Sequence, residues 1–145
     1  MNNIKEISAS ATFAVRHPVL RPGKPLESCR FEGDDLKTTK HFGVFERQNL
    51  VGIVTVLQNK SDLFSEENQF QIRGMAVLES HQKKGFGEKL LLFSEKYIQG
   101  EHGTIIWFNA REHASGFYEK AGYKKIGNLF EIPDVGSHYI MYKNL

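Results

Sequence analysis

Cysteine and long apolar runs are both scarce in this 145-residue chain. The one cysteine, Cys29, excludes an intramolecular disulfide and leaves no cysteine partner for a zinc site. The longest apolar run, residues 50–57, is far shorter than the roughly 20 residues that span a bilayer. Lys5, Glu6 and Arg16 interrupt the N-terminal segment, which therefore lacks the pattern of a cleavable signal. We expect a cytoplasmic protein with no membrane partner.

Charge of one sign is not concentrated either. The 19 Lys and Arg nearly balance the 17 Asp and Glu, which leaves a formal net charge of +2. A dedicated nucleic-acid binder carries a dense basic footprint, so nucleic acid is excluded as the main partner. The 40% hydrophobic and 25% charged residues are typical of a folded globular chain. Because linkers, low-complexity segments and repeats are absent, we expect one domain over residues 1–145.

The N-terminal part is expected to hold a short helix and then an irregular surface segment. Ser8 or Ser10 can cap a helix that ends near His17, because the following proline disfavours helical angles at that residue. Prolines and glycines punctuate residues 21–37, which indicates a long loop. Its acidic residues fit either attraction of a cationic amine or an ordinary solvated loop; they are Glu27, Glu32, Asp34 and Asp35.

A hairpin and a third strand are expected next. Residues 38–45 and 50–57 are rich in β-formers, and the polar residues 46–49 between them fit a hairpin connection. Apolar and polar side chains alternate at the start of the segment 69–77. Gly74 interrupts that alternation and predicts a β-bulge.

The second half alternates helices and strands. Phe86, Leu90, Phe93 and Tyr97 recur at helical spacing, which predicts an amphipathic helix ending near Gly100. The remaining patterns predict a strand at 104–109, a short helix at 114–121, and closing strands at 123–126 and 138–143. The element order indicates a mixed α/β fold.

The most informative stretch is the basic, glycine-containing turn that leads from the strand at 69–77 into this helix. The first turn of a helix has free amide groups and the positive end of the macrodipole, so it attracts anions. Gly85 and Gly87 let a phosphate approach the backbone, and Lys83 and Lys84 add positive charge. Taken alone, the glycines also fit an ordinary turn into a helix.

Spacing excludes two nucleotide motifs at this turn. A Walker A loop needs a Gly-Lys-Ser/Thr sequence, which is absent, and the dinucleotide fingerprint needs a third glycine where Leu90 stands. The remaining pattern, Gln82-x-x-Gly85-x-Gly87, resembles the pyrophosphate motif of the GNAT superfamily of acyl-CoA-dependent N-acetyltransferases.

The resemblance extends from about residue 38 to the C-terminus. Residues 75–77 resemble the end of the family's central strand, and residues 109–123 resemble its Ala-x-x-Phe-Tyr-x-x-x-Gly-Tyr signature. Val-Leu-Arg-Pro at 19–22 and the segment 134–138 are similar to a small bacterial branch, which carries that tetrapeptide and a C-terminal Gly-x-x-His segment.

The resemblance implies a mixed α+β fold with a central twisted sheet of six to seven strands, splayed parallel strands at its centre and about four flanking helices. It implies transfer of an acetyl group from acetyl-CoA, without a metal, to a primary amine of a small molecule or peptide by direct attack in a ternary complex. A homodimer formed through sheet edges is compatible with it. Two alternatives are a non-catalytic acyl-CoA sensor of the same fold and a cysteine hydrolase built on Cys29, which the nearby carboxylates disfavour.

The resemblance also implies residue roles. The Val77 N–H is the expected oxyanion donor, and Tyr118 is the expected proton donor to the thiolate. Tyr118 and Phe117 also fit helix-core aromatics, as we expect for Phe117. Arg111 stands where the family often carries an Asn, so Asn109 is the expected contact to the pantetheine arm. The expected acetyl-CoA contacts are Met75, Ala76, Val77, Gln82, Lys83, Lys84, Gly85, Phe86, Gly87, Glu88, Asn109 and Tyr118.

The general base stays open among His138, Glu79 and the acidic residues of 21–37. Histidine suits the role because it changes charge near neutral pH. Arg111 is a candidate ligand for a cofactor phosphate or a substrate carboxylate, and Arg73 shares one strand face with Gln71. The candidate acceptor contacts are therefore Arg73, Glu79, Arg111 and His138.

Overall fold

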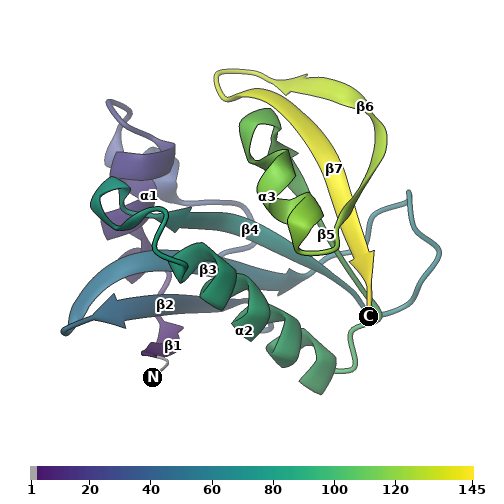
Figure 1. The fold of residues 1–145 in the computed structure, drawn as a ribbon, viewed down its shortest axis with the longest axis horizontal. Helices are drawn as coiled ribbons and strands as arrows, with labels where there is room; N and C mark the ends of the chain where they lie inside the picture. The colour runs from purple at the N-terminus through teal and green to yellow at the C-terminus, as the bar shows by residue number, and fades with distance from the viewer. Residues whose placement is uncertain (1–2) are drawn as a thin grey trace.

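A seven-stranded sheet organises the computed structural model, which describes residues 3–145 (Figure 1). The strand order is β1-β2-β3-β4-β5-β7-β6. The strands are β1 (Ile4–Ile7), β2 (Lys40–Glu46), β3 (Asn49–Gln58), β4 (Gln69–Val77), β5 (Ile105–Arg111), β6 (Lys124–Ile132) and β7 (Gly136–Asn144). The α-helices of the described chain are α1 (Phe13–Leu20), α2 (Phe86–Gly100) and α3 (Ser115–Lys120).

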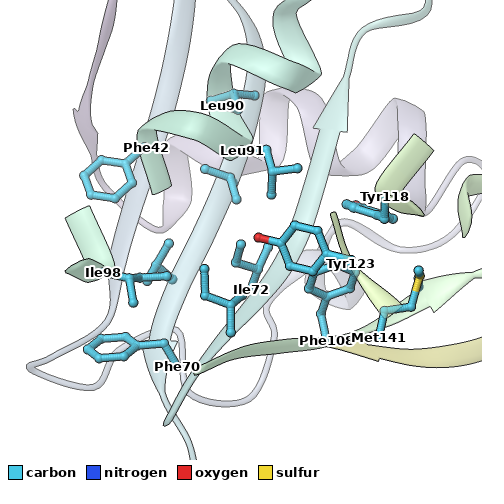
Figure 2. Packing of buried hydrophobic residues seen from close by; sticks show 14 of the residues in the cluster. Phe42, Phe70, Ile72, Leu90, Leu91, Ile98, Phe108, Tyr118, Tyr123 and Met141 are labelled. Atoms are coloured by element: carbon cyan, nitrogen blue, oxygen red, sulfur yellow. The ribbon is translucent and has the colours of Figure 1, made fainter. Parts of the chain in front are cut away.

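The helices cover both faces of this sheet. Ile53 and Val54 are neighbours on β3, so their side chains point to opposite faces. Val54 belongs to the core cluster under α2, whereas Ile53 packs against α1 through Val15. Figure 2 shows the larger cluster, whose labelled members are Phe42, Phe70, Ile72, Leu90, Leu91, Ile98, Phe108, Tyr118, Tyr123 and Met141. Burial of apolar side chains on both faces therefore fixes α1 and α2 on opposite sides of the sheet.

Several expectations are confirmed. The strand at 69–77 and the helix that ends at Gly100 have the predicted bounds, and the hairpin forms between β2 and β3. Its turn is shorter than expected, because only Arg47 and Gln48 separate the strands. Both have positive φ, 50° and 72°, which matches the right-handed twist of a tight hairpin.

Other expectations are wrong in detail. The described chain has three α-helices where about four were expected, and β1 was not predicted. Strand β1 lies at the sheet edge with Lys5 and Glu6 exposed, so its short sequence carries almost no apolar alternation. The last two strands, β6 and β7, are longer than predicted.

Helix α1 also continues past the predicted stop at His17, with Pro18 inside it. Val19 and Leu20 pack against the cluster of Val15, Ile53 and Ala76. This burial offsets the helical hydrogen bond that proline cannot donate.

A buried ion pair connects α1 to the loop at 21–39. Arg16 and Asp34 are 0% and 2% exposed, and the guanidinium donates to both carboxylate oxygens at 2.6 and 3.0 Å. The same guanidinium donates to the Cys29 carbonyl at 2.7 Å and to the Thr55 hydroxyl at 2.9 Å. The expected surface segment is therefore partly buried, because Arg16 draws Asp34 and Cys29 against the sheet.

Two opposing effects act on the pKa of Asp34. Burial raises it, but the hydrogen bond from Arg16, the Phe31 N–H and the charge of Arg16 together hold the pKa below its usual range. A depressed carboxyl pKa stabilises the fold above the pKa of the unfolded chain, and this contribution is lost as the pH falls through the folded value.

Asp34→Asn should therefore lower the free energy of unfolding by about 3 to 5 kcal/mol at neutral pH, because it leaves the Arg16 charge buried without its partner. The variant should also lose stability less steeply than the wild type as the pH falls below the usual carboxyl range. Urea unfolding at several pH values measures both effects. Asp35→Asn is the matched control. Asp35 also forms an ion pair, with Arg30 at 3.7 Å, but both side chains are exposed, so this pair contributes little stability. Equal stabilities of the wild type and Asp34→Asn would contradict the role of the ion pair.

None of the helices in residues 3–145 combines the length and the apolar character that a membrane crossing requires.

Candidate functional site

Strands β4 and β5 form the one parallel pair of the described sheet, and they separate after a short contact. They are paired only where Gln69–Gln71 faces Ile105–Trp107. Beyond this point the two ribbons diverge, with β4 running toward α1 and β5 running beside α3 (Figure 1). The backbone groups on the facing edges of the diverging segments are therefore free of pairing between these two strands.

A β-bulge at Gly74 accompanies this separation, as the sequence predicted. Ile53 faces Ala76 and Thr55 faces Arg73, so one residue of β3 stands opposite two residues of β4. Gly74 has φ +63°, a left-handed conformation that favours glycine. An added Cβ there would lie 3.0 Å from the Phe31 ring, so the bulge also permits the close approach of the loop at 21–39.

A cleft of about 1120 Å³ opens between the diverging strands. Its walls come from β4, β5, the start of α2, α3, the end of α1 and the loop at 21–39. The structure places here most of the residues that the sequence singled out: Arg73, Met75, Ala76, Val77, Gln82, Lys83, Gly85, Phe86, Gly87, Glu88, Asn109, Arg111, Tyr118 and His138. Lys84 and Glu79 are exposed and do not line the cleft.

Val77 ends β4 with its backbone turned toward the cleft. The Leu78 N–H donates to the Val51 carbonyl at 2.8 Å, and Val77 faces Gly52. Hydrogen-bonded and non-bonded pairs alternate in an antiparallel ladder, so the Val77 N–H and C=O point away from β3. The carbonyl accepts a hydrogen bond from the Gln82 side chain at 2.9 Å. Gln82 thus ties the turn to the end of β4 and leaves the Val77 N–H directed into the gap.

Helix α2 begins with uncapped amide groups at the cleft. Its first hydrogen bond runs from the Lys89 N–H to the Gly85 carbonyl at 3.1 Å, and no side chain caps the helix. The amides of Phe86, Gly87 and Glu88 precede that bond and have no intrahelical acceptor. Gly85 has φ +87°, whereas a Cβ on Gly87 would only reach ordinary contact with Phe117 at 3.6 Å. The left-handed backbone at residue 85 therefore favours glycine, whereas a side chain at residue 87 would be sterically tolerated.

Tyr118 combines core packing with access to the cleft. It is 9% exposed, and its ring centroid lies 4.4 Å from that of Phe108 and 5.1 Å from that of Phe117. Burial raises the pKa of Tyr118 to about 12, so the phenol stays protonated at neutral pH. The expectation that Phe117 is a core aromatic is wrong, because its side chain is 41% exposed.

Asn109, Arg111 and His138 lie on the sheet face opposite α2. Ile106, Phe108 and Ala110 belong to the core under α2, so the odd-numbered residues of β5 point to the other face. Arg111 faces His138 across the β5–β7 pair. His138 is buried, and its Nδ1 lies 2.7 Å from the Gly136 carbonyl. A carbonyl can only accept, so Nδ1 carries the proton and Nε2 is the basic nitrogen.

Arg21 and Phe31 are cleft residues that the sequence reasoning missed. Arg21 follows α1 and lies over the Phe31 ring, with 5.0 Å from its guanidinium carbon to the ring centroid. Both residues line the cleft. Arg21 belongs to the Val-Leu-Arg-Pro segment at 19–22, and its place in this segment was the sequence feature that could have indicated a role in the site. Nothing in the sequence pattern indicated that Phe31 would reach the bulge of β4.

The Cys29 thiol does not have the surroundings of a nucleophile. It is fully buried outside the cleft lining, and burial raises its pKa. These features disfavour the cysteine hydrolase alternative. Within residues 3–145, no group of three or more His, Cys, Asp and Glu side chains is placed to hold a metal ion.

The family model described as "Acetyltransferase (GNAT) family" matches residues 5–123. The chain belongs to the GNAT acetyltransferase family. The uncharacterized N-acetyltransferase YitI of Bacillus subtilis (strain 168) is a relative that is 34% identical over 145 residues, which cover 100% of this GNAT chain and 97% of YitI. The resemblance seen in the motifs is therefore confirmed at the level of the family.

Solved structures have the same fold. An aminoglycoside 6′-N-acetyltransferase complexed with coenzyme A has a TM-score of 0.77 at 16% identity, with 97% of this chain and 96% of that chain covered. Escherichia coli ElaA has a TM-score of 0.76 at 19% identity, with 99% of each chain covered. The expected mixed sheet with splayed central strands is thus confirmed as the GNAT fold.

Gly74→Ala should destabilise this GNAT domain by about 1 to 2 kcal/mol or more, because alanine is strained in the left-handed backbone conformation of residue 74 and its Cβ would crowd Phe31. Thermal unfolding measures the change. Gly116→Ala is the matched control, since a Cβ there meets nothing within 4 Å and alanine favours the helix α3. If Gly74→Ala unfolds at the wild-type midpoint, the bulge does not depend on this conformation.

Proposed function

We propose that the protein transfers an acetyl group from acetyl-CoA to a primary amine by direct attack within a ternary complex. The observation that carries the proposal is the cleft between diverging strands, which joins the uncapped start of α2 to the free N–H of Val77 and the phenol of Tyr118. Family membership and the coenzyme A complex of the similar aminoglycoside acetyltransferase support it.

The backbone around Gly85 suits the pyrophosphate of acetyl-CoA. Three amide groups without intrahelical acceptors and the positive end of the α2 dipole favour an anion. The left-handed Gly85 presents no side chain there, and Lys83 adds charge at the cleft lining. Residues 75–77 of β4 offer unpaired backbone groups to the extended pantetheine arm, as a neighbouring strand would.

The reaction needs an oxyanion donor and an acid. The amine nitrogen attacks the thioester carbonyl carbon, a C–N bond forms and the C–S bond breaks. The Val77 N–H stabilises the negative charge that develops on the carbonyl oxygen. Tyr118 donates its proton to the departing sulfur, which leaves as the thiol. The raised pKa of Tyr118 ensures that this proton is present throughout the neutral range.

His138 is the base that fits the structure best. In the tautomer that donates from Nδ1 to the Gly136 carbonyl, the Nε2 of this buried, cleft-lining side chain is available to take the proton that the amine loses. Glu79 is exposed outside the cleft lining. Among the acidic residues of 21–37, Asp34 is engaged by Arg16 and only Glu32 lines the cleft.

Acetyl-CoA at about 100 times its dissociation constant should stabilise the protein by roughly 2.7 kcal/mol and raise the unfolding midpoint by several degrees. Free CoA should give a similar shift. Gly85→Ala should weaken binding about tenfold, because it strains the turn that holds the pyrophosphate. Gly100→Ala, at the far end of α2, is the matched control and should bind normally. No shift with millimolar acetyl-CoA would refute the proposed function.

Tyr118→Phe should lower kcat about a hundredfold while acetyl-CoA binding stays unchanged, because the ring remains and only the acid is lost. His138→Gln should lower kcat to a similar extent at neutral pH, where most of the amine is protonated, and the difference from the wild type should shrink at low pH, where a base is itself protonated. Tyr142→Phe is the control, since Tyr142 packs in a separate cluster outside the cleft. Thiol release measures the rates. A Tyr118→Phe variant with wild-type kcat would exclude the phenol as the acid.

A further inference from the structure

The cleft has two sides of different chemistry. The uncapped start of α2 and Tyr118 lie on the sheet face that α2 covers, because Tyr118 packs into that core with Phe108. Arg73 lies on the opposite face, since Phe70 and Ile72 of β4 point toward α2. Arg111 and His138 share this opposite face. The site for the pyrophosphate and the side that the arginines line therefore lie on opposite faces of the sheet, and the gap between β4 and β5 connects them.

Three guanidinium groups from three different elements converge on the arginine side. Arg21 follows α1, Arg73 extends from β4 and Arg111 ends β5, and all three line the cleft. Arg73 donates to the Glu32 carbonyl at 2.5 Å, Arg111 to the Leu20 carbonyl at 3.4 Å, and Arg21 to the same carbonyl at 2.9 Å. Within residues 3–145, none of the three forms an ion pair with a carboxylate.

Arg73 and Arg111 are partly desolvated, and the charges of Arg21 and Arg111 repel each other. Burial lowers the pKa of Arg111, and the neighbouring charge of Arg21 lowers it further. Burial also lowers the pKa of Arg73, while the nearby charges of Asp34 and Glu32 act in the opposite direction. Arg73 and Arg111 nevertheless keep their charges at neutral pH, because arginine titrates far above it. An anion placed between these side chains would reduce this repulsion. It would also accept hydrogen bonds from the three guanidinium groups, each of which donates to one backbone carbonyl in the structure.

The acidic residues of the loop offset this positive charge only in part: Asp34 and Glu32 act on Arg73 through their charges, but in residues 3–145 neither forms an ion pair with any of the three arginines. Asp34 is buried against Arg16, and the exposed Asp35 lies beside Arg30 at 3.7 Å. Glu27 does not line the cleft. Glu32 is the one acidic residue of the loop at the cleft, where its backbone carbonyl, not its carboxylate, contacts Arg73. The acidity of the segment in the sequence therefore does not create a site for a cationic amine.

From this arrangement we propose that the acceptor is an amine that also carries a carboxylate, an amino carboxylic acid held by Arg21, Arg73 and Arg111. This inference rests on the proposed acetyl transfer. Guanidinium groups bind a planar carboxylate through paired N–H donors. His138, which faces Arg111 across the β5–β7 pair, then lies on the same side as the amine of a carboxylate-anchored substrate. Polyamines and aminoglycosides, which are polycations, would be repelled by the same groups.

The first test compares carboxylates with their amides on the protein saturated with CoA. Each amino acid in the panel, such as glycine, leucine or glutamate, is paired with the amide in which every carboxylate is blocked, and spermidine and kanamycin serve as cations. We expect at least one free acid to bind tenfold or more tightly than its amide, measured by calorimetry or by the unfolding midpoint. If amides or cations bind as well as every acid in the panel, the inference is wrong.

The second test assigns the preference to the arginines. Arg111→Gln and Arg73→Gln should each raise the dissociation constant and the KM for the preferred acid about tenfold or more, with acetyl-CoA binding unchanged. Arg47→Gln, in the remote β2–β3 turn, is the matched control. If these variants weaken acetyl-CoA binding instead, the arginines bind a phosphate of the cosubstrate and the inference fails.

The two levels of failure are distinguishable. A protein that gives no acetyl-CoA shift refutes the proposed function itself. A protein that binds acetyl-CoA and acetylates amines without preferring free acids to their amides retains that function and refutes only the acceptor class.

Discussion

The buried pair of Arg16 and Asp34 determines where one wall of the cleft lies. The Arg16 guanidinium connects α1 to the loop and to β3 through four hydrogen bonds to three residues, Cys29, Asp34 and Thr55. It also packs on the Phe31 ring, with 4.0 Å from the guanidinium carbon to the ring centroid. A buried ion pair contributes little net stability, because desolvation offsets much of the attraction. Its larger effect here is positional, since it holds an otherwise irregular loop against the bulge of β4.

The proposed function divides recognition between backbone and side chains. On the α2 side the relevant groups are amides at the helix start and along residues 75–77, which depend on the fold more than on side-chain identity. This agrees with the retention of the fold in a structure only 16% identical to this chain. On the other side the groups are side chains of Arg21, Arg73, Arg111 and His138, which substitutions change one at a time. In the proposed function, the acceptor therefore contacts side chains, which single substitutions can alter without changing the backbone that would hold the cosubstrate.

The sequence predicted those parts of the fold that local patterns control. The helical spacing of α2, the Gly74 bulge and the turn at Gly85 each have a local physical cause, so they were recognised. Strand β1 and the last turn of α1 form because of packing between distant segments, and local propensity did not reveal them. The same holds for the site. In the sequence Asp34 is one of several acidic residues of a loop, and only the folded structure shows that it pairs with Arg16.

The sheet consists of two halves with separate chain segments. Strands β1 to β4 come from residues 4–77 and strands β5 to β7 from residues 105–144, and each half is antiparallel within itself. Only three residue pairs join the halves, beside the layer of α2. This short seam acts as the vertex of an angle, so a small rotation there changes the width of the opening several residues away. Any molecule that bridges β4 and β5 completes the missing ladder and thereby couples its own binding to the relative orientation of the two halves.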